Sequence, residues 1–129
     1  MLPEVGTARK AGPEGPSITE PAESWPVVDE RILHGYEEVI QKDPQDHATR
    51  WKLAQAYASL GNHAAALEQG EELVQRGEFV DEVITYLEQT AGTGAKTRRV
   101  YQLLGDAYFK TDRLDKAVDA YRKALTLLQ

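Results

Sequence analysis

Three histidines are the first candidates for metal or acid–base chemistry. His34, His47 and His63 lie 13 and 16 residues apart, and none belongs to a His-x-x-x-His or His-Glu pair. A zinc site needs several ligands that converge on one point, so these histidines could share a metal only if the fold alone brought them together. Their spacing favours surface or turn positions and predicts no metal site.

Paired carboxylates and a glycine-rich segment are the other candidates for catalysis. The acidic pairs at 37–38, 71–72 and 81–82 are typical of polar helix faces, where solvated charges oppose Lys or Arg, rather than of acid–base catalysts. The segment at 92–97 (Gly-Thr-Gly-Ala-Lys-Thr) is superficially similar to a phosphate-binding loop, but it lacks the P-loop spacing and a preceding β-strand. We therefore predict no catalytic residues, no cofactor and no enzymatic activity.

The composition indicates one ordinary globular domain. The chain has 129 residues, of which 41% are hydrophobic, and this is enough to bury a core. Without cysteine, disulfides and thiolate metal sites are excluded. A net charge of −6 with no basic run makes nucleic acid a poor partner. No apolar stretch approaches the ~20 residues that span a bilayer, and the first residues lack a signal-peptide pattern, so we expect no membrane insertion and a cytoplasmic location.

The chain divides into two parts that differ in composition and in the spacing of their apolar residues. Residues 1–26 hold five of the six prolines and several glycines, which predicts a flexible tail or linker; a proline-rich ligand for another domain is the alternative. Such a start also suits a piece of a longer protein. Residues 27–129 contain short turn signals, with helical spacing of apolar residues between them and no β-type alternation. This pattern predicts a domain of about six helices.

Two stretches of this domain align without gaps. Residues 51–61 (Trp-Lys-Leu-Ala-Gln-Ala-Tyr-Ala-Ser-Leu-Gly) match 102–112 (Gln-Leu-Leu-Gly-Asp-Ala-Tyr-Phe-Lys-Thr-Asp), and Ala66-Leu67 matches Ala117-Val118 in the helix that follows. Small residues in such positions let two helices approach closely, while tyrosine and leucine fill the space beside them.

Through these residues the chain resembles the tetratricopeptide repeat family, whose 34-residue unit is a helix–turn–helix. The resemblance is closest for Leu104-Gly105, Tyr108, Ala117 and Tyr121. It implies an all-α fold, a right-handed α-solenoid of antiparallel helix pairs, with clear repeats near 47–76 and 97–128. Residues 36–44 look like the closing helix of a preceding, degenerate unit.

The two clear copies are offset by 51 residues, which is one and a half family units. Residues 78–91 therefore supply a single helix where a pair is expected. We expect a shortened and distorted middle repeat over 78–97; a change in the curvature of the stack is the alternative.

The family resemblance also implies a concave groove for a protein partner, either a peptide or a helix, lined by the first helix of each pair. Carried over by position, the groove residues are Trp51, Gln55, Ala58, Ser59, Arg99, Gln102, Asp106, Phe109 and Lys110. Because Trp51, Gln55 and Leu103 replace polar and basic residues of the family's carboxylate clamp, binding of chaperone tails is not expected. Trp51 is open to two interpretations, burial in the repeat core or exposure as the anchor of the groove.

The chain also ends on apolar residues without a polar capping helix. The edge formed by Leu114, Val118, Leu125 and Leu128 is therefore expected to be covered by a second copy, a partner or further repeats. The sequence thus favours a non-catalytic protein-binding scaffold. The alternatives are a self-assembly module that forms a homo-oligomer and a regulatory domain of a larger protein.

Overall fold

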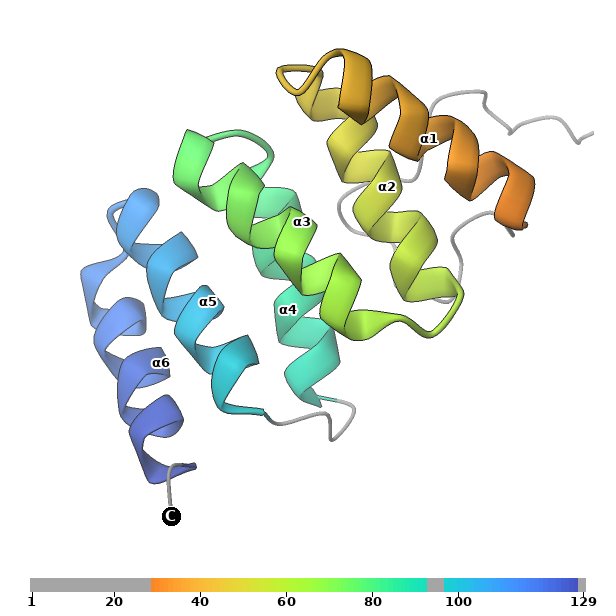
Figure 1. Ribbon diagram of the computed structural model, residues 1–129. Helices are drawn as coiled ribbons and strands as arrows, with labels where there is room; N and C mark the ends of the chain where they lie inside the picture. The colour runs from red at the N-terminus through yellow and green to blue at the C-terminus, as the bar shows by residue number, and fades with distance from the viewer. Residues whose placement is uncertain (1–28, 93–96, 128–129) are drawn as a thin grey trace, which may run out of the picture.

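The computed structural model describes residues 29–92 and 97–127, which form six helices and no strand. The helices follow one another along a single stack (Figure 1). They are α1 (Glu30–Lys42), α2 (His47–Ser59), α3 (His63–Arg76), α4 (Val80–Gly92), α5 (Arg98–Lys110) and α6 (Leu114–Thr126). The predicted all-α helical-repeat fold is confirmed. The tail predicted for residues 1–26 lies outside the described residues.

Side-chain caps fix where four of these helices begin. Asp29, Asp46, Asn62 and Thr97 each accept a hydrogen bond from the backbone N–H three residues further on. Each cap satisfies a donor that the first helical turn leaves free, and typically contributes ~1 kcal/mol. The short loops of the sequence therefore lead directly into helices of 13 or 14 residues.

The core lies mainly where α3, α4, α5 and α6 meet. Leu73 of α3 and Leu87 of α4 are completely buried, and Ala107 and Ala117 bring α5 and α6 together. Small and large apolar residues thus alternate across the helix contacts, as the sequence predicts.

A repeated hydrogen bond shows how the six helices are related. The hydroxyl of Tyr57 on α2 donates to the carboxylate of Glu37 on α1, and that of Tyr108 on α5 donates to Glu88 on α4. Both bonds span 20 residues, and the two sets are 51 residues apart. The turns agree as well, because Gly61 and Asp112 both have a positive φ. The described part of the chain therefore consists of two related three-helix units, unit 1 (α1–α3) and unit 2 (α4–α6).

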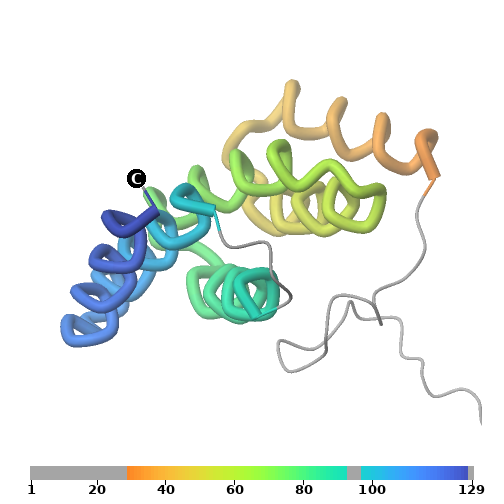
Figure 2. The backbone as a smooth tube through the Cα atoms, turned by 90° about the horizontal axis from the view of Figure 1, so that it is seen from below, coloured from red at the N-terminus to blue at the C-terminus, as the bar shows by residue number. Residues whose placement is uncertain are grey.

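The correspondence between the two units also explains the place of the helix in the middle of the chain. Between the two clear copies the middle contains one helix, α4 (13 residues), at the place where the sequence predicts a single helix instead of a pair. Because Glu88 takes the place of Glu37, α4 is the counterpart of α1. Figure 2 shows α4 set to one side of α3 and α5. The remainder of the expected middle repeat, residues 93–96, lies outside the described residues.

Candidate functional site

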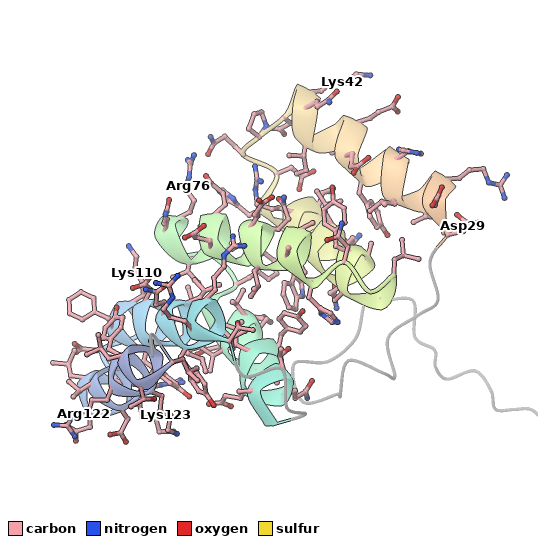
Figure 3. All side chains as sticks on the ribbon, turned by 60° about the horizontal axis from the view of Figure 1, so that its bottom comes forward. Asp29, Lys42, Arg76, Lys110, Arg122 and Lys123 are labelled. Atoms are coloured by element: carbon pink, nitrogen blue, oxygen red, sulfur yellow. The ribbon has the colours of Figure 1, made fainter. Side chains whose placement is uncertain are left out.

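One side of α5 gathers the residues that sequence analysis assigned to the groove. Spacings of three, four and seven residues place them on the same side of the helix. This α5 surface consists of Arg99, Gln102, Asp106, Phe109 and Lys110. All five side chains are exposed, and Phe109 is 63% exposed. Figure 3 shows Lys110 at the end of this helix.

Part of the α5 surface lines a cleft of about 220 Å³. Arg99, Gln102 and Asp106 form its α5 side, Leu67 and Glu71 come from α3, and Tyr121 comes from α6. Arg99 Nη2 lies 3.9 Å from Glu71 Oε1, and both side chains are about half exposed. A long ion pair between exposed groups contributes little free energy, so Arg99 can exchange Glu71 for another carboxylate.

The floor of the cleft is held by a bond between α6 and α5. The hydroxyl of Tyr121 donates to the carboxylate of Asp106. Burial, together with this bond to a carboxylate, raises the pKa of Tyr121 to about 12. At neutral pH the phenol is therefore a fixed donor, and Asp106 is already engaged by it.

The α2 half of the predicted groove is arranged differently. Trp51 and Ala58 are half-buried and pack against the main core cluster, and Gln55 is only 9% exposed. Gln55 therefore does not present a surface to a partner, contrary to its predicted role, because this side of α2 faces the protein interior. Ser59 is exposed, but neither it nor Trp51 lines the cleft on α5.

The predicted C-terminal edge is exposed along α6. Leu114, Val118 and Leu125 present large apolar side chains to solvent, and Leu127 adds to them. Leu128 lies outside the described residues.

A second cleft, of about 390 Å³, lies between α4, α5 and α6 and was not predicted from the sequence. The Nζ atoms of Lys116 and Lys123 lie 5.7 and 5.8 Å from the ring centroids of Tyr108 and Tyr101. A ligand would have to displace these two cation–π contacts. A comparison of the two units could have indicated this cleft. Ala120 of unit 2 stands where unit 1 has Gln69, whose side chain accepts a hydrogen bond from Arg50.

The histidines that were considered as metal ligands have different surroundings. His34 contacts Glu37 on the exposed side of α1, and His63 Nδ1 lies 3.1 Å from the hydroxyl of Tyr86. Within residues 29–92 and 97–127, no group of three or more potential ligands is placed to hold a metal ion. In the same ranges, no helix has the length and apolar character needed to cross a membrane.

Two related units of stacked helices, with an exposed surface on α5, define a helical-repeat protein. Residues 99–127 match a tetratricopeptide repeat profile, and residues 33–81 match a second profile with the same description. Together the two matches cover more than half of the chain, which therefore belongs to the tetratricopeptide repeat family. Comparison with curated proteins gave no match. Repeats of this family are generally protein–protein interaction modules and typically have no catalytic activity.

Proposed function

We propose that this protein is a non-catalytic scaffold that binds a segment of a partner protein along the α5 surface. The observation that carries the proposal is the exposure of Phe109 on the same side of α5 as two cations, Lys110 beside it and Arg99 near the start of the helix, about 15 Å away along its axis. Aromatic and arginine side chains dominate the binding energy of protein interfaces. Phe109 supplies the apolar contact, and the two cations supply the electrostatic one.

These groups define the chemistry of the partner segment. An apolar side chain of the segment would cover the ring of Phe109, and a carboxylate further along the segment would replace Glu71 at Arg99. Within the described residues the side-chain amide of Gln102 has no hydrogen-bond partner, so it suits the backbone of an extended peptide. The expected ligand is therefore an extended segment with an apolar residue and, about four or five residues away, an acidic one.

A peptide library displayed on phage and selected against the full chain tests this function. The affinity of the selected peptides is then measured for the wild type, for Phe109→Ala and for Arg99→Glu. We expect each change to weaken binding by about tenfold or more, as truncation of an interface anchor does.

Two variants away from the α5 surface serve as controls. Leu60→Ala removes an exposed apolar side chain after α2, and Arg31→Glu reverses an exposed charge on α1. Both are expected to bind like the wild type. Selected peptides that bind Phe109→Ala as tightly as the wild type would show that the segment does not bind on α5.

A second candidate function is assembly through α6. It is favoured by the row of exposed apolar residues Leu114, Val118 and Leu125. Contiguous apolar surface of this kind is typical of a face that contacts another protein.

A further inference from the structure

The junction between unit 1 and unit 2 shows what covers the outer face of the last helix of a unit. On α3, Leu67 is 8% exposed and Val74 2% exposed, and on α4 Val83 is 1% exposed. A Cβ atom added to Gly70 of α3 would lie 3.4 Å from Val83 Cγ1 and 3.6 Å from Leu103 Cδ2. Unit 2 thus buries the outer face of unit 1 through residues of both α4 and α5.

The same positions recur at the two ends of the molecule, where nothing within the described residues covers them. Val118 and Leu125 of α6, the counterparts of Leu67 and Val74, are 49% and 62% exposed. Ile32 of α1, the counterpart of Val83, is 42% exposed. Figure 1 shows that α1 and α6 lie at opposite ends of the stack. The chain therefore presents both halves of its own internal junction.

We propose that these two faces bind each other between two copies of the chain, head to tail. The trailing face (Val118, Tyr121 and Leu125 on α6) of one molecule contacts the leading face (Ile32 on α1 and Lys52 on α2) of the next. The inference rests on the assembly function proposed above and names its partner surface. Unit 1 of the second copy takes the place that unit 2 has within the chain.

The two ends carry opposite net charges, although three of the α6 cations have partners within the molecule: Arg113 pairs with Asp81, and Lys116 and Lys123 lie over tyrosine rings. The α1 end carries four carboxylates, with Arg31 and Lys42 as its cations; the α6 end carries four cations, with Asp115 and Asp119 as its carboxylates. The four carboxylates are Asp29, Glu30, Glu37 and Glu38, and the four cations are Arg113, Lys116, Arg122 and Lys123. Figure 3 shows Asp29 at one end of the molecule and Arg122 and Lys123 at the other. Opposite net charges favour the approach of unlike ends at long range, and the contact itself is made by the apolar residues.

One pair of residues at the junction changes together. Inside the chain, Leu103 packs over Gly70; at the ends, their counterparts are Lys52 and Tyr121. A leucine could not occupy the space that the Tyr121 ring fills, whereas the flexible side chain of Lys52 can lie over that ring in a cation–π contact. The change in both partners preserves a contact at this position.

A head-to-tail contact leaves one free face at each end of every open assembly. Such contacts form open chains, or rings if the rotation between neighbours closes. This property distinguishes the proposal from a symmetric dimer, in which two α6 faces would contact each other and association would stop at two copies.

Sedimentation velocity of the full chain over a range of concentrations tests the proposal, with one variant for each face. Ile32→Glu places a charge on the leading face, and Leu125→Glu places one on the trailing face. Leu60→Glu is the control, because Leu60 is as exposed as Ile32 (43%) but lies on neither face. Circular dichroism verifies that all three variants keep their helices.

We expect the wild type and Leu60→Glu to form larger species as concentration rises. Each of the other two variants alone should associate at least about tenfold more weakly, because its interface would contain an unpaired charge. An equimolar mixture of Ile32→Glu and Leu125→Glu should give a dimer and nothing larger, because one intact leading face meets one intact trailing face.

Two results would overturn the proposal. A wild type that stays monomeric at every concentration would remove both the assembly function and this contact, and would leave the α6 face to further repeats or another protein. Self-association of Ile32→Glu that matches the wild type, with a mixture no larger than its parts predict, would retain assembly but identify a symmetric α6 contact.

Discussion

The ring of Tyr121 on α6 lies directly over the backbone of Gly105 on α5. A Cβ atom added to Gly105 would be 2.5 Å from Cε1 of that ring. In unit 1 the corresponding residues are Ala54 and Gly70, and there the space above Gly70 is filled by Val83 and Leu103 of unit 2. In unit 2, a residue of the same unit, Tyr121, therefore fills this space. In unit 1, residues of the neighbouring unit fill it.

Gly105→Ala is therefore expected to destabilise the protein. The aromatic ring cannot retreat without losing the hydrogen bond from Tyr121 to Asp106, and overpacking of this kind typically costs about 1–3 kcal/mol. The free energy of unfolding in urea measures the effect. Gly35→Ala on α1 is the matched control, because nothing lies within 4 Å of the added Cβ. It should stabilise the protein by ~0.5–1 kcal/mol through helix propensity. Equal loss in both variants would contradict the role of the ring.

Much of the fold could be predicted because close helix contacts require particular residue types. Ala54 and Gly105 occupy the same repeat position, as do Tyr57 and Tyr108, and few arrangements other than helical hairpins explain small and aromatic residues recurring in one order. The exposed α5 surface followed from the same alignment. Residue type and spacing were sufficient there because the opposite side of α5 is apolar.

The placement of α4 and the burial of Gln55 could not be predicted in this way. The alignment began at residue 51, so it did not reach Glu37 and Glu88, whose shared partners reveal that α4 corresponds to α1. Gln55 is predicted to line the groove from its position in the family repeat, yet its burial depends on how α2 is oriented toward the core. That orientation is a tertiary property, and the spacing within one helix does not contain it.

Tyr57→Phe should reveal the bond that joins α1 to α2. The hydrogen bond from Tyr57 is the main reason why the pKa of Glu37 lies below its ordinary value of 4.5, so the variant should return that pKa toward 4.5. A depressed carboxylate pKa contributes stability above 4.5 that is lost as the pH falls through the pKa of the folded state. Wild type and variant should differ by ~1 kcal/mol at neutral pH and by less in acid.

Urea unfolding at neutral and acidic pH measures this difference, and carboxyl NMR shifts follow Glu37 itself. Tyr36→Phe is the control, because within residues 29–92 and 97–127 the hydroxyl of Tyr36 makes no hydrogen bond. A Glu37 pKa that is the same in wild type and Tyr57→Phe would show that the bond does not form in solution.

Alkaline titration should distinguish the structural tyrosines. Burial, followed by hydrogen bonds to Glu37 and Asp106, raises the pKa of Tyr57 and of Tyr121 to about 12, from an ordinary value of 10. The folded protein keeps these protons where the unfolded chain releases them. The corresponding stability is complete below pH 10 and is lost as the pH rises toward 12. Tyrosinate absorbance should therefore rise later in the native protein than in urea, and Tyr121→Phe should remove one of the late steps.

Two leucines of the stack, Leu73 and Leu125, should differ sharply in their contribution to stability. Leu73 of α3 is completely buried, whereas Leu125 of α6 is exposed. Leu73→Ala leaves a cavity between the helices and should lower the free energy of unfolding by about 2–5 kcal/mol. Leu125→Ala removes a solvated side chain and, at concentrations where the chain is monomeric, should change it by no more than ~0.5 kcal/mol. A large loss for Leu125→Ala under those conditions would mean that its side chain packs within the same molecule, and the trailing face would then not be free to bind a second copy.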